Sequence, residues 1–331
     1  MNLRSGKVVL ALSLLLLSLP MALTVRADSF DDAQDWLQRM SVAMQELDYQ
    51  GTFVYVRGND VETMRLTHVR VGDVVHERMV AISGPQREIM RDETGVRAIL
   101  GGQSQPTQDP MFTGAVFPDI SLAALSKAQE RYLFEVGGVG RIAGHQGRKI
   151  SIIPRDQYRF GYELWLEQET GLLLRWVLYD TDRSALAKLM FTDLATGTSV
   201  DHDDLQSDAP AQSFFAVQQA SPVLEKPAVT GATSEAPEGI PPGFRLAAHS
   251  RVEKEAFFEH LVFSDGLASV SIYLESATQP GGITPGLTRM GTTSAWSGKA
   301  GSRRVTAVGE VPPLTLKTFG EAFLAGQEAG D

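Results

Sequence analysis

The chain has 331 residues, no cysteine and a formal net charge of −10 at pH 7. Without cysteine it can form no disulfide, thiolate nucleophile or thiolate metal site, and so acidic a surface argues against nucleic-acid binding. Its length is sufficient for two hydrophobic cores.

The first 27 residues predict export. Arg4 and Lys7 form a positive segment, residues 8–19 are an apolar run, and Val25-Arg26-Ala27 resembles a small-residue cleavage site. This pattern is typical of a secretory signal peptide, and the run is too short to span a bilayer. No later run is long enough either, so we expect a soluble mature chain that begins at residue 28.

Residues 31–47 carry apolar side chains at helical spacing and predict an amphipathic helix. Two strands around the turn Gly58-Asn59-Asp60 follow it. If Arg57 lies opposite Val61, one face carries Val54, Val56, Met64 and Leu66, and the other carries Phe53, Tyr55, Arg57, Thr63 and Arg65. The second face would then mix aromatic rings with polar groups, although such sheets usually have one apolar and one polar face.

The pattern up to residue 205 continues as strands with one short helix. The strands are predicted at 74–82, 87–92, 96–100, 132–136, 149–154, 161–167, 172–180 and 186–194, and the helix at 119–129. Helices are few and do not alternate with strands, so the sheet should be antiparallel.

Residues 206–238 are rich in Ala, Ser, Pro and Thr and predict a linker between two domains, 28–205 and 239–331. In the second domain we expect strands at 244–248, 259–264, 267–275 and 303–311 and a helix at 313–324. A hairpin should turn at Asp265-Gly266.

The sequence motifs of catalysis and cofactor binding that we sought are missing or incomplete. Residues 138–143 match G-x-G-x-x-A, but the chain returns to a strand at Lys149 and leaves no helix for a pyrophosphate. A glycine-rich hairpin is the better interpretation. The six histidines lack metal-ligand spacing, and residues 201–204 lack the glycine and glutamate of a calcium loop. We predict no enzyme, catalytic residue, metal site or cofactor.

Residues 161–180 hold more apolar side chains than one core face requires. One predicted face carries Tyr162, Leu164 and Leu166, and the other carries Glu163, Trp165 and Glu167. Such a sheet can curve into an open barrel whose concavity is covered by the helices or binds a ligand. The lipid-binding candidates are Phe53, Tyr55, Phe112, Phe117, Trp165 and Trp176.

The charge is distributed unevenly along the chain. Residues 28–205 hold 18 basic and 27 acidic side chains, whereas residues 239–331 hold 8 and 9. Residues 281–309 contain basic side chains and no acid. Because Arg and Trp often dominate interfaces, the partner-binding candidates are Arg289, Trp296, Arg303 and Arg304. The alternative is that Arg303 and Arg304 keep a strand edge soluble.

Several long motifs carry a family resemblance. The run "LWLEQETGLLLRWVLYD" resembles the lipoprotein-carrier superfamily, whose members are half-open β-barrels that shelter acyl chains. The stretches "LDYQGTFVYVRGNDVETMRLTH", "GPQREIMRD", "HLVFSDGLASVSIYLE" and "VTAVGEVPPLT" together resemble the MucB/RseB family across both domains.

This resemblance implies an α+β, mainly antiparallel fold, with an N-terminal half-open β-barrel covered by short helices and a smaller C-terminal antiparallel sheet with a helix. It also implies a periplasmic negative regulator of the envelope-stress sigma factor. Such a protein binds the periplasmic region of a membrane-spanning anti-sigma factor, shields it from the initiating protease, and senses lipid or lipopolysaccharide. A periplasmic lipid or lipoprotein carrier is the alternative function. A hydrolase is a third, and homo-oligomerisation stays open.

Overall fold

The computed structural model describes residues 30–100, 117, 122–197, 202–207, 209–210, 214–216, 236–253, 257–276 and 285–328. The predicted signal peptide, residues 1–27, and the predicted loop 101–110 lie outside these ranges. No described helix is long and apolar enough to cross a membrane.

The larger of two sheets has eleven antiparallel strands in the order β11-β5-β4-β3-β2-β1-β10-β9-β8-β7-β6. Its strands are β1 (Tyr49–Arg57), β2 (Asp60–Val71), β3 (Val74–Ala81), β4 (Arg87–Asp92), β5 (Gly95–Leu100), β6 (Tyr132–Ile142), β7 (His145–Pro154), β8 (Gly161–Glu167), β9 (Leu173–Tyr179), β10 (Ala185–Thr196) and β11 (Phe215–Ala216). The accompanying helices are α1 (Phe30–Glu46), α3 (Leu122–Ala128) and the 3-10 turn η1 (His202–Leu205). The predicted antiparallel meander is confirmed, with shifts of a few residues at the ends of several elements.

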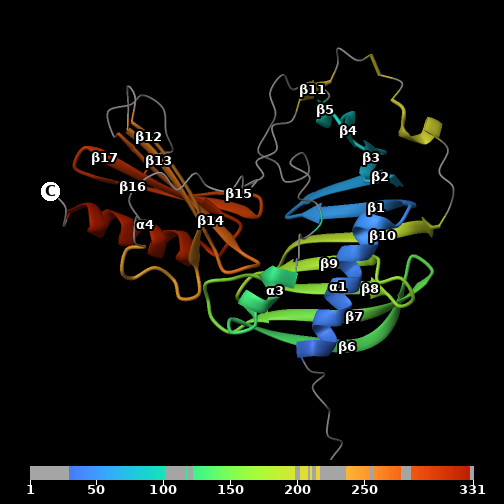
Figure 1. Cartoon of the computed structure of the whole chain (residues 1–331), viewed down its shortest axis with the longest axis horizontal. Coiled ribbons are helices and arrows are strands. Elements are labelled where there is room, and N and C mark those ends of the chain that lie inside the picture. The colour runs from blue at the N-terminus through green and yellow to red at the C-terminus, as the bar shows by residue number, and fades with distance from the viewer. Residues whose placement is uncertain are drawn as a thin grey trace, which may run out of the picture.

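Helix α1 lies across strands β6 to β10 and covers one face of the sheet (Figure 1). It buries Ala33, Leu37, Met40 and Ala43, which recur on one side of the helix. Arg39 Nη2 donates to the carbonyls of Gln168 and Glu169 at 3.0 and 2.8 Å. These bonds attach α1 to the β8–β9 turn, so the predicted covering helix is in place.

The register of the first hairpin differs from our expectation by one residue. Arg57 pairs with Asp60, and Phe53 pairs with Met64. Directly opposed residues share a face, so Phe53 and Tyr55 lie with Met64 and Leu66 in the core. The face that carries Phe53 and Tyr55 is therefore the apolar one, and Arg65 belongs to the exposed face.

The sheet curves strongly without closing among its described strands. At one end of the curve the His145 Nε2–H donates to the Leu194 carbonyl at 2.9 Å, which joins the β6–β7 hairpin to β10. Glycine-rich residues 138–147 form this hairpin, as predicted, with Ala143 and Gly144 at positive φ. The half-open barrel covered by helices is confirmed.

The smaller sheet has six strands in the order β12-β13-β14-β17-β16-β15. They are β12 (Arg245–Glu253), β13 (Phe257–Ser264), β14 (Ser269–Ser276), β15 (Gly286–Met290), β16 (Thr293–Ala300) and β17 (Arg303–Gly309). Helix α4 (Pro313–Glu328) packs on one face through Leu316, Phe319 and Phe323 (Figure 1). Strands β15 and β16 were not predicted, because glycines interrupt their sequence.

Part of the predicted linker 206–238 belongs to the larger sheet. Phe215 and Ala216 form β11, which pairs with Ala98 and Arg97 of β5. Ser207 Oγ also donates to Glu88 Oε2 at 2.8 Å. The extent of the linker within 206–238 stays a prediction, and the chain remains attached to the first sheet until at least residue 216.

Gly320 of α4 supports a direct prediction of stability. A Cβ at Gly320 would lie 2.0 Å from two ring carbons of Trp296, so the indole packs directly on the helix backbone. We expect Gly320→Ala to lower the free energy of unfolding by about 1–3 kcal/mol, because overpacking outweighs the better helix propensity of alanine.

Gly326→Ala in the same helix is the matched control, since the nearest atom to its Cβ would lie 3.8 Å away. It should leave stability unchanged or raise it by up to about 1 kcal/mol. Urea denaturation of both variants checks this, and equal stability of the two would contradict the packing argument.

Candidate functional site

Three phenylalanines form a packed group on the core face of the larger sheet. The Phe53 and Phe191 ring centroids lie 5.7 Å apart, and Phe117 lies 6.1 Å from Phe53 and 6.4 Å from Phe191. Phe53 and Phe191 are buried, whereas Phe117 is half-buried and lies outside the regular elements. Phe117 therefore covers the rings of two neighbouring strands.

Tyr55 and Trp176 continue this group, with ring centroids 6.0 Å apart. Of the lipid-binding candidates, Phe53, Tyr55, Phe117 and Trp176 thus share one face. Trp165 lies on the opposite face, where its Nε1 donates to Glu163 Oε1 at 3.0 Å. Strand alternation places it there, so Trp165 does not share a face with the other candidates, and lipid binding by Trp165 stays a prediction. Phe112 lies outside the described residues.

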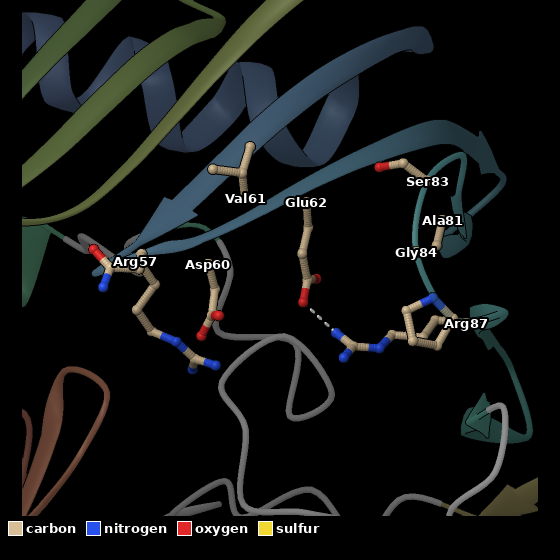
Figure 2. Close-up of a pocket in the computed structure, with 10 residues that line it drawn as sticks. Arg57, Asp60, Val61, Glu62, Ala81, Ser83, Gly84 and Arg87 are labelled. Atoms are coloured by element: carbon tan, nitrogen blue, oxygen red, sulfur yellow. Dashed lines mark hydrogen bonds and ion pairs between the residues drawn. The ribbon is translucent and has the colours of Figure 1, made fainter.

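A pocket of about 360 Å³ opens beside the end of the first hairpin. Figure 2 shows Arg57, Asp60, Glu62 and Arg87 around it, with Arg87 Nη1 paired to Glu62 Oε1. Arg57 also touches the second domain, because a Cβ on Gly291 would lie 2.8 Å from its Cδ. One guanidinium therefore lines the pocket and packs on the β15–β16 turn.

Arg57 also acts electrostatically on the second domain. The pKa of Glu310 is raised because the surrounding protein desolvates its carboxyl group, while the charge of Arg57 opposes that rise. On the other side of the interface, Arg289 Nη2 lies 3.9 Å from Asp180 Oδ2. These contacts are the outer parts of the domain interface.

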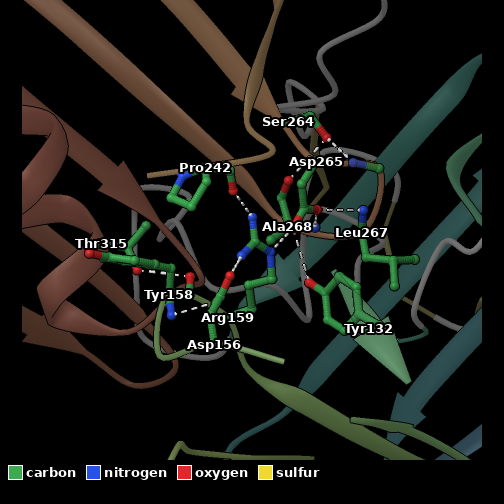
Figure 3. A network of polar contacts seen from close by, with 11 residues as sticks. Tyr132, Asp156, Tyr158, Arg159, Pro242, Ser264, Asp265, Leu267, Ala268 and Thr315 are labelled. Atoms are coloured by element: carbon green, nitrogen blue, oxygen red, sulfur yellow. Dashed lines mark hydrogen bonds and ion pairs between the residues drawn. The ribbon is translucent and has the colours of Figure 1, made fainter. Parts of the chain in front are cut away.

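The centre of the interface is a buried ion pair (Figure 3). Arg159, in the loop between β7 and β8, donates from Nε to Asp265 Oδ2 of the β13–β14 turn at 2.5 Å. Both side chains are fully buried. Arg159 Nη2 also donates to the Pro242 carbonyl at 2.5 Å, and Nη1 pairs with Asp156. One arginine thus joins three segments of the chain.

The partners of Asp265 complete the network. Tyr132 Oη donates to Oδ2 at 3.2 Å, and the N–H groups of Leu267 and Ala268 donate to Oδ1 at 2.9 and 2.8 Å. A further bond runs from Thr315 Oγ1 to the Tyr158 carbonyl at 2.8 Å. Burial works against the charge on Arg159, yet its bond and attraction to Asp265 raise the pKa of its guanidinium.

This arrangement favours one placement of the two domains. Desolvating two charges is costly, and a buried pair contributes to stability only when its hydrogen bonds are satisfied. Arg159 and Asp265 meet this condition, and moving either domain would leave a charge buried without its partner. We call the bonded group of Arg159 and Asp265 the joint. We expect the joint to specify the relative placement of the two domains more than to add stability.

The partner-binding candidates do not form one exposed patch. Arg304 is only 7% exposed, and Trp296 packs against Gly320 of α4. Arg303 is half-buried, and Arg289 lies at the domain interface. For Trp296 and Arg304 a structural role is therefore the better interpretation, and partner binding by Arg289 and Arg303 stays a prediction.

Sequence reasoning missed the residues that join the domains. Asp265 was noted only as part of a turn, and Arg159 lies in an irregular loop without periodicity. A long-range charge pair leaves no local pattern, so no signal in the sequence could have matched them.

The two sheets are joined by a buried ion pair and bordered by a polar pocket. They define a two-domain, mainly antiparallel binding protein. Models of the MucB/RseB N-terminal and C-terminal domains match residues 32–209 and 233–323. The chain belongs to the MucB/RseB family.

Named relatives agree over nearly the whole chain. Sigma factor AlgU regulatory protein MucB of Pseudomonas aeruginosa is 31% identical over 308 residues, covering 90% of this chain and 92% of that protein. Sigma-E factor regulatory protein RseB of Escherichia coli is 26% identical over 295 residues, covering 88% and 90%.

Solved structures support the same family. The crystal structure of MucB in complex with MucA(peri) is similar with a TM-score of 0.65 and 27% identity, covering 87% of this chain and 97% of that one. The crystal structure of MucB has a TM-score of 0.59, with 27% identity and coverage of 88% and 97%.

The joint predicts a large effect of Asp265→Asn. Removing the carboxylate charge leaves the Arg159 guanidinium buried without its counter-charge, so the free energy of unfolding should fall by about 3–5 kcal/mol. Urea denaturation followed by tryptophan fluorescence measures this change.

Asp73→Asn is the control, because this aspartate is fully exposed on the β2–β3 turn. It should change stability by less than about 0.5 kcal/mol. A double variant, Arg159→Met/Asp265→Asn, should regain part of the loss, because no buried charge remains. Equal stability of Asp265→Asn and Asp73→Asn would contradict the joint.

Proposed function

We propose that this chain is a periplasmic negative regulator of an envelope-stress sigma factor. It binds the periplasmic region of a membrane-spanning anti-sigma factor and shields that region from the initiating protease. The observation that carries this proposal is the likeness to MucB in complex with MucA(peri), which extends over 87% of this chain and both sheets. The signal peptide pattern supports the location.

Shielding requires surface and needs no catalytic group. A protease must bind its substrate in extended form, and a partner that covers the cleavage segment blocks access. A stable interface of this kind buries about 1,200–2,000 Å². The two domains, held together by Arg159 and Asp265, offer a continuous surface across the interface. We therefore assign no enzymatic activity to the chain.

Release by a lipid or lipopolysaccharide amphiphile is the second part of the proposal. The group Phe53, Phe117 and Phe191 is apolar, and its half-buried member lies outside any helix or strand. An acyl chain that took the place of Phe117 would gain about 25 cal/mol per Å² of apolar surface covered. The same exchange would rearrange the covered face of the sheet and so alter the partner surface.

The regulatory part predicts the outcome of a protection assay. The mature chain, the periplasmic region of its cognate anti-sigma factor and the initiating protease are mixed, and the cleavage rate is measured. We expect the wild-type chain to slow cleavage and an added lipid A-like amphiphile to restore it. An unchanged cleavage rate at a saturating concentration of the wild-type chain would contradict the regulatory function. The lipid-carrier function would then be the remaining alternative.

Arg303→Glu tests the basic stretch in this assay, and Lys317→Glu on the exposed side of α4 is the control with the same charge change. Arg303→Glu should weaken protection about three- to tenfold if this stretch contacts an acidic segment, because it reverses a charge at the rim of the interface. Equal protection by both variants would assign Arg303 to solubility of the strand edge.

Lipid binding predicts different roles for two tryptophans. Titration with the same amphiphile should change tryptophan fluorescence in a saturable way. Trp176→Phe should abolish most of that change, because Trp176 lies on the face of the phenylalanine group. Trp165→Phe, on the opposite face, should retain it. A response that disappears only in Trp165→Phe would place the ligand on the other face.

A further inference from the structure

A second pocket, of about 530 Å³, lies along strands β6 to β9 where the larger sheet meets the second domain. Its charged lining residues are Glu135, Lys149, Asp156, Glu163, Asp180 and Arg183. Tyr162, Tyr179, Ile153 and Pro154 add aromatic and aliphatic surface. Four carboxylates and two cations thus line the pocket, together with apolar side chains that suit the methylene chain of a long side chain.

Three of the four carboxylates are paired within the fold. Asp180 contacts Arg289, and the pairs of the other two are shorter or more buried. Glu163 lies 3.8 Å from Lys149 Nζ and 3.7 Å from Arg175 Nη2, and Asp156 pairs with the buried Arg159. Glu135 is exposed on β6 and makes no ion pair with any described residue. Glu135 and Asp180 therefore carry the negative potential of the open side.

The chain itself places a guanidinium at this rim. Arg289 of the second domain reaches within 3.9 Å of Asp180 Oδ2, and the Arg289 side chain stays 43% exposed. So long and exposed a contact is weak, and it leaves Asp180 free to accept from a second donor. The contact shows that an arginine reaching across the interface is sterically accommodated here.

The turn that carries Asp180 is shaped to hold it in position. Arg183 has a φ of 67°, which is uncommon for a residue other than glycine. The Arg183 N–H donates to the Asp180 carbonyl at 2.9 Å, and the Thr181 N–H donates to Asp180 Oδ1 at 2.7 Å. One carboxylate oxygen is thereby held by the backbone, and the other faces Arg289.

We infer that this pocket binds a lysine or arginine side chain of the anti-sigma factor's periplasmic region, which rests on the function proposed above. The cation would pair with Asp180, and its methylene chain would pack on Tyr179 and Pro154. Glu135 lies three strands away on β6 and would add only to the negative potential. Charge complementarity favours such a partner, because residues 28–205 carry 27 acidic and 18 basic side chains. The pocket borders the second domain at Asp180, which contacts Arg289, so a segment that extended past Asp180 would reach the second domain.

Docking then involves the acidic first domain as well as the basic stretch at 281–309 of the second domain. The basic stretch at 281–309 suits acidic residues of a partner, whereas this pocket selects basic ones. Recognition by both would fix the direction in which the segment crosses the interface, since each charge fits only one side.

The test uses the full mature chain and the recombinant periplasmic region of its cognate anti-sigma factor, with affinity measured by calorimetry at two salt concentrations. Glu135→Gln/Asp180→Asn should weaken binding about tenfold and reduce its salt dependence. The control is Asp73→Asn/Glu93→Gln, which makes the same change in charge on two exposed turns at the other end of the strands. It should bind like the wild-type chain.

Two further variants separate the explanations. Arg289→Gln removes the contact between Asp180 and the second domain, and it should weaken binding less than Glu135→Gln/Asp180→Asn does. A loss equal to that of Glu135→Gln/Asp180→Asn would instead mean that Asp180 acts only by holding the second domain. Asp180→Lys should abolish tight binding, and a partner whose pocket-contacting lysine or arginine is changed to glutamate should restore it.

The two proposals fail in different ways. If the wild-type chain does not bind the periplasmic region at all, the proposed function is overturned. The other case is that the wild-type chain binds and Glu135→Gln/Asp180→Asn binds as tightly as its control. The proposed function is then supported, and the inference that the pocket binds a basic side chain is overturned.

Discussion

The buried bond between Arg159 and Asp265 is the contact on which the arrangement of this molecule depends. It lies at the centre of the domain interface, and Tyr132, Asp156 and the Pro242 carbonyl complete it. Ion pairs at the surface tolerate relative motion of the domains. A desolvated pair does not, because a shift of one domain along the other leaves each charge buried without its partner. The two sheets are therefore held as one unit, and a partner meets a single continuous surface.

The outer contacts of the interface are more exposed to solvent than its centre. Arg57 and Arg289 cross between the domains at positions that border open pockets, and both remain accessible to other groups. A partner can compete for these contacts without breaking the central joint. The interface thus combines a buried central ion pair with partly exposed charges at its edge, which agrees with the binding and release proposed above.

The curved sheet contributes a separate apolar feature. Its core face gathers Phe53, Phe191 and Trp176 under a cover to which the half-buried Phe117 belongs. This group and the charged interface lie on the same strands, β1 and β9 among them. A ligand that rearranged the cover would act on strands whose ends carry Arg57 and Asp180. Under the function proposed above, the sheet would connect lipid binding to partner release.

Much of this architecture was predictable from the amino-acid sequence. Alternation of apolar residues predicted most strands, helical spacing predicted α1 and α4, and turn residues such as Asp265-Gly266 placed the hairpins, because these signals depend only on neighbours along the chain. The register of the first hairpin was off by one residue, and that error moved Phe53 and Tyr55 to the wrong face. Strands β15 and β16 were missed because their glycines mimic a loop.

What only the tertiary structure decided is which distant residues meet. Arg159 and Asp265 are 106 residues apart, and their pairing arises from the packing of two sheets that fold from separate patterns. The same holds for Asp180 with Arg289, for Trp296 on Gly320, and for the opposite faces of Trp165 and Trp176. The sequence by itself determined most of the local elements and the family, and it predicts an export signal. Contacts between elements depend on shape in three dimensions, and the linear order of residues carries no local mark of them.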